Sequence, residues 1–321
     1  MSTVLKARAA HEPGVRHDLV FTQDRGGRAT FAGLPNVDLR VVHKGRIAAF
    51  VQYALTNVPY ADVSVTSLPD LASTVAGRTD VPVFYEFHTS TREIISTELA
   101  ALDIDRLAGV RVPSEYLADM VRGQLPHRHR GAVMVVPNLV DTATFRPDGA
   151  AMPVCGPGQR PLVWVGRFDK GKNFRDFLRL MSLLPTEFVG VVVVSLEHDP
   201  DRMAQFLSEV AYFRLEDRVS LHMNLDQARM AAVYRAAARA GGTFCSTSLA
   251  ESFGYGVLEA MHCGLPAVAY AVGALSEHRT AGGELKLVDV GDLDALADAI
   301  RSVTDGAGHL PYALATASSS S

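Results

Sequence analysis

The sequence predicts an α/β protein made of two Rossmann-like, doubly wound domains. The first observation is that its apolar segments are short and do not alternate with polar residues, as in Val189–Val194 (VGVVVV). Strands of a parallel sheet show this pattern because helices cover both faces of the sheet. The second observation is that segments with helical spacing separate these strands, which indicates repeated strand–helix units. The third is the length, since 321 residues correspond to about two domains.

The expected elements follow one another along the whole chain. Leu5–Ala10 is expected to be the end of a helix that precedes the first strand. Strands are expected at the apolar runs His17–Thr22, Val37–Val42, Val81–Phe87, Ala132–Val136, Leu162–Val165 and Val189–Val194. Helices are expected where apolar residues recur every three or four positions. These segments include Arg92–Leu107, Phe174–Leu184, Met203–Tyr212, Asp226–Arg239, Gly256–Cys263 and Leu293–Val303.

A segment rich in proline and glycine separates the two predicted domains. Arg146–Pro161 contains four prolines and three glycines, and such a segment cannot join a sheet. The sequence therefore predicts an N-terminal Rossmann-like domain of residues 1–148 and a C-terminal one of residues 149–312. The low-complexity residues 313–321 are expected to be a disordered tail. A cleft between two such domains is a favoured place for a ligand.

Composition excludes several classes of protein. Hydrophobic residues make up 48% and charged residues 21% of the chain, as in globular proteins. The net charge of −4 offers no basic field that could hold nucleic acid. The three cysteines form no CxxC pair, so we expect neither a disulfide framework nor a zinc site. The N-terminus lacks the apolar core of a signal peptide, and no apolar run could span a bilayer, so we expect a cytoplasmic protein without an integral membrane segment.

The stretch Glu251–Pro266 (ESFGYGVLEAMHCGLP) carries most of the expected chemistry. Gly254 and Gly256 lie where a loop should turn into a helix, and free N–H groups at a helix start favour phosphate. Glu259 would lie about one turn into this helix, where its carboxylate can accept two hydrogen bonds from a ribose diol. Glu251 would face the group beyond the phosphates. The alternative is a loop with two solvated glutamates.

A second stretch, VWVGRFDKGKNF, places two cations after a buried strand. Arg167 follows the strand directly, and Lys172 lies five residues later, near the next helix. An arginine fork and a lysine point charge suit a diphosphate, and ligands bind at this edge of open parallel sheets. The alternative is a solvated basic loop.

Together these stretches resemble the nucleotide-sugar-binding half of the family 4 glycosyltransferases, which have the GT-B fold. VGRFDKGKN matches the family's Arg-x4-Lys phosphate motif, and ESFGYGVLE matches its Glu-x7-Glu motif. PNLVDTATFRP (Pro137–Pro147) is similar to the segment that leads into the family's linker, and VYRAA (Val233–Ala237) also fits. The resemblance extends over Ala61–Ile300.

The resemblance implies a role for each matching residue. Arg167 and Lys172 would neutralise the departing diphosphate, and Glu259 would hold the nucleotide ribose. Glu251 would contact the hydroxyls of the donor sugar. The backbone of the glycine turn would line the sugar and phosphate pocket, with Phe253, Gly254, Tyr255, Gly256 and Val257 as its donor-binding residues.

In the N-terminal half, VPVFYEFHTS resembles the family's strand that ends in an active-site histidine. This residue is His88, which would contact the transferred sugar. The alternative for His88 is an ordinary core or surface histidine.

The resemblance implies a retaining glycosyltransferase that needs no metal or other cofactor. It would move a sugar from a nucleoside-diphosphate sugar to a hydroxyl of a small-molecule, glycan or lipid-linked acceptor, and the leaving phosphate would take the acceptor's proton. The DxD motif Asp103 to Asp105 falls in a predicted helix, so no metal is expected there. Two alternatives stay open. One is a nucleotide-sugar epimerase or hydrolase on the same fold, and the other is a nucleotide-binding protein without transfer activity.

The chain departs from the family at both ends. HDLVFTQ (His17–Gln23) corresponds to the family's second strand, so the first strand and its Gly-Gly loop are expected to be lacking. The C-terminus follows soon after Ile300, whereas relatives continue into a helix that crosses back to the first domain. The acceptor site and catalytic competence depend on these parts.

Overall fold

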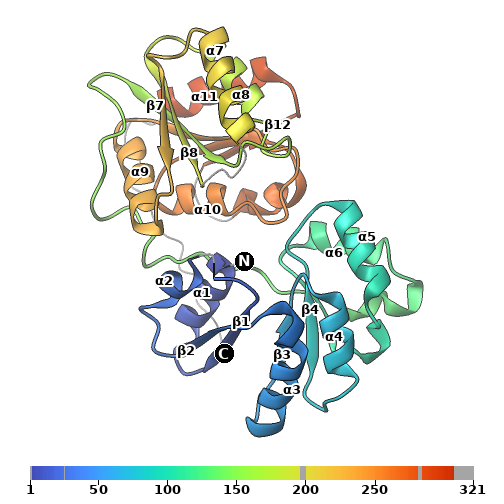
Figure 1. Ribbon diagram of the computed structural model, residues 1–321. Coiled ribbons are helices and arrows are strands. Elements are labelled where there is room, and N and C mark those ends of the chain that lie inside the picture. The colour runs from blue at the N-terminus through green and yellow to red at the C-terminus, as the bar shows by residue number, and fades with distance from the viewer. Residues whose placement is uncertain (1, 25, 196–199, 281–283, 307–321) are drawn as a thin grey trace. The chain divides into compact units, whose positions relative to one another are not determined.

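The computed structural model describes residues 2–24, 26–195, 200–280 and 284–306. The predicted tail at residues 313–321 lies outside them. The chain divides into two compact units, Met1–Asp141 and Thr142–Ser321, which we call unit 1 and unit 2. Each unit combines parallel strands with helices, as predicted (Figure 1). The domain boundary predicted between residues 148 and 149 lies a few residues after the division between Asp141 and Thr142.

Unit 1 contains two parallel ladders of strands. Strands β1 (His17–Phe21) and β2 (Val37–Val41) pair with each other. The second ladder has the order β3-β4-β5-β6, with β3 at Val63–Val65, β4 at Val83–Glu86, β5 at Gly109–Val112 and β6 at Val133–Val135. The helices of the unit are α1 (Ser2–His11), α2 (Gly27–Phe31), α3 (Ile47–Asn57), α4 (Pro69–Ala76), α5 (Arg92–Ala101) and α6 (Glu115–Arg122). Short 3₁₀ turns lie at Lys44–Arg46, Ile104–Arg106 and His127–Ala132.

The four-stranded sheet of unit 1 has one apolar and one polar face. Val83 and Tyr85 of β4 and Val110 of β5 belong to the buried core, together with residues of α4, α5 and α6. Because successive side chains of a strand point to opposite faces, the intervening residues lie on the other face. There Glu86 is paired in register with Arg111, an opposite-charge pair across β4 and β5.

The helix predicted over Arg92–Leu107 is shorter than expected. It ends at Ala101, because Leu102 adopts an extended conformation with φ −88° and ψ 133°. The hydroxyl of Ser73 on α4 accepts a hydrogen bond from the backbone N–H of Asp103 at 3.0 Å, which replaces a helical bond. The prediction that the DxD motif lies within a helix is therefore wrong.

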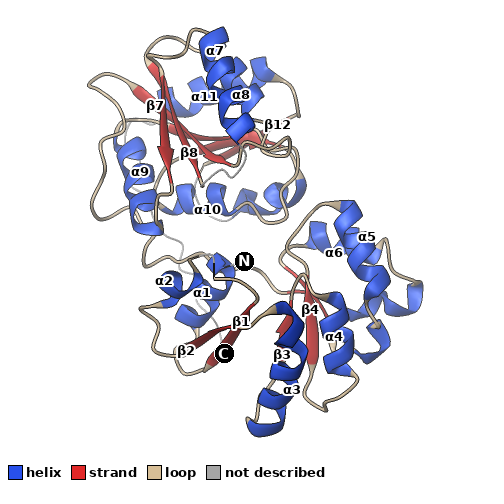
Figure 2. Ribbon diagram, in the orientation of Figure 1, coloured by secondary structure: helices blue, strands red, loops and turns tan. Residues whose placement is uncertain are grey.

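Unit 2 contains a six-stranded parallel sheet of order β12-β11-β10-β7-β8-β9 (Figure 2). Its strands are β7 (Arg160–Gly166), β8 (Phe188–Val194), β9 (Val219–Met223), β10 (Thr243–Ser246), β11 (Ala267–Tyr270) and β12 (Leu285–Val288). Its helices are α7 (Phe174–Leu183), α8 (Pro200–Tyr212), α9 (Gln227–Arg239), α10 (Tyr255–His262) and α11 (Leu293–Gly306), with a 3₁₀ segment, η4, at Gly273–Thr280. Helices α7, α8 and α11 lie on one face and α9 and α10 on the other (Figure 1). All residues of β8 are buried, which explains its unbroken apolar sequence.

Two arginines of α9 hold the linker segment of residues 144–150 against unit 2. The side chain of Arg235 is buried, and its Nε donates to the carbonyl oxygen of Ala150 at 2.7 Å. Its Nη1 donates to the carbonyl of Thr144 at 3.2 Å. Arg239 donates to the carbonyl of Gly149 at 2.8 Å. Residues 144–150 are therefore fixed to the helix that carries the VYRAA motif.

Among the described residues, no helix has both the length and the hydropathy that crossing a membrane requires. The thiols of Cys155, Cys245 and Cys263 are free. Burial raises the pKa of Cys245 and Cys263, which makes both inert structural residues.

Candidate functional site

The strand order of unit 2 reverses between β7 and β10. The first strand of the unit is β7, with β8 and β9 on one side of it and β10, β11 and β12 on the other. Ligands of open parallel sheets bind beyond the carboxyl ends of the strands at such a reversal. The loops that follow β7 and β10 carry Arg167, Lys172 and Glu251.

The β7 loop holds both predicted phosphate-binding cations. Nζ of Lys172 lies 2.5 Å from Oε1 of Glu251, although the two residues are 79 positions apart. The side chain of Arg167 is 71% exposed, and its Nη2 lies 3.0 Å from Oδ2 of Asp169. The other carboxylate oxygen of Asp169 accepts a hydrogen bond from the backbone N–H of Lys172 at 2.9 Å. The structure therefore brings Lys172 and Glu251 into contact and holds Arg167 on the same loop.

Hydrogen bonds join the β7 loop to the β10 loop. The indole N–H of Trp164 donates to Oγ1 of Thr247 at 3.1 Å, and both side chains are buried. The same Oγ1 shares its one proton between the carbonyl oxygens of Asn173 at 2.9 Å and Lys172 at 3.2 Å. The backbone N–H of Leu249 donates to the carbonyl oxygen of Gly171 at 2.8 Å. These bonds fix the backbone from which the side chain of Lys172 extends.

A glycine turn leads from the β10 loop into α10. Gly254 caps the helix with φ +87°, a left-handed conformation that favours glycine. A Cβ atom at Gly254 would overlap the side chain of Leu275, and one at Gly256 would lie 3.1 Å from the ring of Phe244. Glycine is therefore strongly favoured at Gly254, and a side chain at Gly256 would have to displace the ring of Phe244. The first N–H groups of α10, together with the helix dipole, can bind an anion.

The η4 segment supports this turn from the other side. The backbone N–H of Ala274 donates to the carbonyl oxygen of Glu251 at 2.9 Å. Gly273 has φ +56°, and a Cβ atom there would overlap the same carbonyl. Nε2 of His278 donates to the carbonyl oxygen of Phe253. The backbone that leads into the glycine turn is therefore held by η4 before a ligand binds.

The remaining donor-binding candidates lie on or beside α10. Glu259 is half buried on this helix. The pKa of Tyr234 on α9 is raised, first by burial and second by the negative charge of Glu259. The side chains of Tyr234 and Glu259 are therefore neighbours. The ring of Tyr255 packs against the ring of Phe253, with 4.9 Å between centroids. Val257 is 2% exposed, and its backbone N–H donates to the carbonyl oxygen of Gly254 at 3.1 Å.

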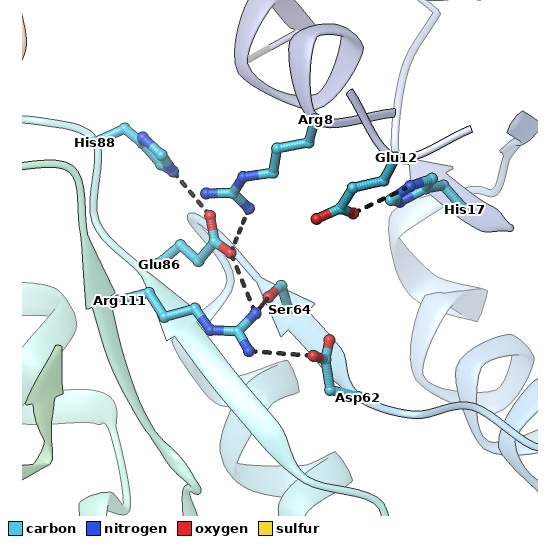
Figure 3. A network of polar contacts seen from close by, with 8 residues as sticks. All are labelled: Arg8, Glu12, His17, Asp62, Ser64, Glu86, His88 and Arg111. Atoms are coloured by element: carbon cyan, nitrogen blue, oxygen red, sulfur yellow. Dashed lines mark hydrogen bonds and ion pairs between the residues drawn. The ribbon is translucent and has the colours of Figure 1, made fainter. Parts of the chain in front are cut away.

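His88 lies in unit 1, whereas the other predicted site residues lie in unit 2. It follows β4, and its Nε2 lies 3.0 Å from Oε2 of Glu86 (Figure 3). The other carboxylate oxygen of Glu86 accepts a hydrogen bond from Nη1 of Arg8 on α1 at 2.7 Å. Arg111 lies beside the same carboxylate and forms an ion pair of 3.1 Å with Asp62 (Figure 3).

The carboxyl group of Glu86 has a strongly shifted pKa. Burial by itself raises this pKa, but the hydrogen bonds from His88 and Arg8 and the charge of Arg8 outweigh burial. The pKa is lowered from the ordinary 4.5 to about 2. Glu86 is therefore a carboxylate at any physiological pH, and it can only accept hydrogen bonds.

Within the described residues, no three His, Cys, Asp or Glu side chains are grouped so that they could hold a metal ion. Asp103 forms an ion pair of 2.9 Å with Arg106, and Asp105 lies on the turn that follows it. That the reaction needs no metal stays a prediction.

Sequence reasoning missed several residues that shape the site. Asp169 and Thr247 act through loop contacts that no local pattern shows. For His278 the signal was weak, since only a glycine after β11 marks the turn that precedes it. Glu86 had a clear signal, because it is a charged residue in an apolar strand, two positions before His88.

Comparisons with known proteins relate the chain to glycosyltransferases. The family described as glycosyl transferases group 1 matches residues 159–305. A D-inositol 3-phosphate glycosyltransferase of Mycolicibacterium smegmatis is 28% identical over 325 residues, covering 98% of this chain and 65% of the relative. The enzyme of the same name from Mycolicibacterium gilvum is 29% identical over 281 residues, covering 85% of this chain and 55% of the relative. The chain thus spans 55% and 65% of the length of these two relatives.

Solved structures show the same fold at low sequence identity. Anabaena Alr3699/HepE, crystallised with UDP-glucose, has a TM-score of 0.74 and 15% identity, covering 95% of this chain and 89% of that chain. A sucrose-phosphate synthase from Thermosynechococcus elongatus has a TM-score of 0.72 and 19% identity, covering 94% of this chain and 83% of that chain. The predicted resemblance to glycosyltransferases with two Rossmann-like domains is confirmed.

Proposed function

We propose that this chain transfers a sugar from a nucleoside-diphosphate sugar to a hydroxyl acceptor. The premise is that it is a GT-B glycosyltransferase, in which residues 159–305 match the glycosyl transferases group 1 family. The observation that carries the proposal is the contact between Lys172 and Glu251 beside the glycine turn. Two segments far apart in sequence thereby bring a cation, a carboxylate and the N-terminus of a helix to the strand reversal of unit 2. These are the groups that a diphosphate and a sugar hydroxyl require.

The donor diphosphate is bound by Arg167, Lys172 and the first N–H groups of α10. In the free protein, Lys172 shares its charge with Glu251 and Arg167 shares its charge with Asp169. A diphosphate offers both cations a more highly charged partner. When Lys172 turns to the phosphate, the carboxylate of Glu251 can accept hydrogen bonds from the sugar. Glu259 holds the ribose from the side of α10.

The reaction breaks the bond between the anomeric carbon and the diphosphate oxygen and forms a bond from that carbon to the acceptor oxygen. Negative charge develops on the leaving diphosphate, and the two cations and the start of α10 stabilise it. The acceptor's proton moves to a leaving phosphate oxygen. The configuration at the anomeric carbon is retained because the acceptor attacks on the face that the diphosphate leaves. His88 of unit 1 is assigned to the transferred sugar, and no metal is needed.

UDP-glucose is the first donor to test, because a protein of this fold was crystallised with it. D-inositol 3-phosphate is the first acceptor to test, because the relatives bear its name. Other small-molecule, glycan or lipid-linked acceptors follow. The proposed location is the cytoplasm, as the sequence predicts. Conversion or hydrolysis of the donor without any acceptor would instead identify an epimerase or hydrolase.

Calorimetry with UDP and uridine tests the phosphate assignment. Arg167→Ala should weaken UDP binding about 10- to 100-fold, since a hydrogen bond to a charged group contributes about 1.5–3 kcal/mol. Uridine binding should change less than about twofold, a difference within measurement error. Arg301→Ala is the matched control, because Arg301 is an exposed arginine in an ion pair on α11. Equal losses for UDP and uridine, or no loss for either, would contradict the assignment.

A further inference from the structure

The carboxylate of Glu86 occupies an unusual place in unit 1. It ends the strand β4 on the polar face of the sheet, yet only 3% of it is exposed. In extended backbone, residues two positions apart point to the same side. Glu86 and His88 therefore lie on one side of the chain, and Figure 3 shows their side chains turned toward each other.

Each oxygen of Glu86 has its own partner. Oε2 accepts a hydrogen bond from Nε2 of His88 at 3.0 Å, and Oε1 accepts one from Nη1 of Arg8 at 2.7 Å. Nη1 of Arg111 lies 3.9 Å from Oε1, and the same nitrogen donates to the hydroxyl of Ser64 at 2.9 Å. With partners on α1, β5 and the loop after β4, the carboxylate cannot rotate without losing a charged contact. It is a fixed acceptor.

A fixed acceptor selects one tautomer of the histidine. A carboxylate accepts hydrogen bonds only, so Nε2 of His88 must carry a proton to bond with it. In the neutral imidazole, the acceptor lone pair then lies on Nδ1. The contact also fixes the plane of the ring, as a carboxylate does for other histidines that must keep one orientation.

We propose that Glu86 is a positioning residue, which holds the imidazole of His88 in its Nε2-protonated form and in one orientation, with Arg8 of α1 fixing the carboxylate. This inference rests on the proposed function, since it assumes that His88 contacts the transferred sugar. Glu86 acts on the reaction only through His88. Its effect must therefore disappear when His88 is removed.

A double-mutant cycle tests this coupling. UDP-glucose turnover is measured for the wild type, Glu86→Gln, His88→Ala and the double variant. Glu86→Gln should lower kcat about 10- to 100-fold, while KM for UDP-glucose stays within about threefold, as expected for a group that acts in the transition state. In the His88→Ala background the same change should cost less than about twofold. A full additional loss in that background would overturn the proposal.

Glu98→Gln is the matched control for the cycle. The carboxylate of Glu98, on α5, accepts a hydrogen bond at 2.9 Å from Tyr85, which lies on β4 next to Glu86. Its removal should leave kcat within about twofold, the error of such comparisons. An equal fall of kcat in Glu98→Gln and Glu86→Gln would show that any damage to β4 lowers activity, which would overturn the proposal.

Nitrogen NMR of the full chain separates this inference from the proposed function. The ring signal of His88, assigned with His88→Ala, should show the Nε2-protonated form in the wild type. In Glu86→Gln both tautomers should be populated, because an amide donates as well as accepts. A Nδ1-protonated ring in the wild type would refute the inference even if transfer occurs. If no donor or acceptor gives turnover, the proposed function fails, whereas the NMR result still decides how Glu86 acts on His88.

Discussion

The buried carboxylate of Glu86 makes unit 1 sensitive to acid. Its pKa is lowered from 4.5 to about 2 in the folded protein. A group with a lowered folded pKa stabilises the protein fully above its unfolded pKa, and the stabilisation is lost as the pH falls through both values. The shift corresponds to about 3 kcal/mol, since one pKa unit is worth about 1.4 kcal/mol. Between pH 7 and pH 3 about 2 kcal/mol of this should be lost.

Glu86→Gln removes the titrating group and keeps its size. We expect the wild type to be more stable than the variant at pH 7, and we expect this difference to shrink by about 2 kcal/mol at pH 3. Hydrogen exchange in increasing urea, read from peptides of β4 and β5, gives the free energy of opening of unit 1 at each pH. A difference that stays constant between pH 7 and pH 3 would refute the reasoning.

Two controls test whether the pH dependence of stability comes from the carboxylate of Glu86. Asp62→Asn removes a carboxylate of the same network, but the side chain of Asp62 is 45% exposed, so solvent screens its ion pair with Arg111. Its pH dependence should follow that of the wild type. Trp164, the single tryptophan of the chain, lies in unit 2. Unfolding followed by its fluorescence should show the same pH dependence in Glu86→Gln and the wild type.

Three further predictions concern unit 2. Tyr234→Phe should raise the free energy of unfolding by about 1 kcal/mol, because the Tyr234 hydroxyl is buried without a hydrogen-bond partner among the described residues. Urea unfolding followed by Trp164 fluorescence measures this change, and a loss of stability would mean that the hydroxyl has a partner. Gly273→Ala should abolish UDP binding in calorimetry, since a Cβ atom there overlaps the carbonyl of Glu251; unchanged affinity would mean that this loop moves freely. Glu259→Gln should weaken UDP binding and reduce the penalty for 2′-deoxy-UDP, because it removes the charge from the proposed ribose acceptor; equal discrimination by variant and wild type would remove Glu259 from that role.

Local patterns predicted the parts of the site that a short segment encodes. The glycines at 254 and 256 mark the start of α10, and the apolar run before Arg167 marks the end of β7. The end of α5 was not predictable in this way, because it depends on the hydroxyl of Ser73 from another helix. The helical pattern of Arg92–Leu107 continues past the point where that contact stops the helix.

Pairings between distant residues were also beyond local patterns. The sequence indicated Lys172 and Glu251 separately, but not that they form an ion pair in the free protein. Glu86 was visible as a charge in an apolar strand, yet its role depends on Arg8, 78 positions earlier. Such contacts depend on how the strands and helices are arranged in space, and the spacing of residues within a short segment does not reveal that arrangement.

The hydrogen bond from Trp164 to Thr247 gives the protein an intrinsic optical reporter of donor binding. The hydroxyl of Thr247 donates in turn to the carbonyl oxygens of Asn173 and Lys172, so two hydrogen bonds connect the indole to the backbone of the β7 loop. Tryptophan emission responds to the polarity and hydrogen bonding of the indole N–H, and no second tryptophan obscures the signal. A donor that moves the backbone of the β7 loop as it binds should therefore shift the emission of the unlabelled chain, and a panel of nucleotide sugars can be ranked by titration in a fluorimeter before any acceptor is known.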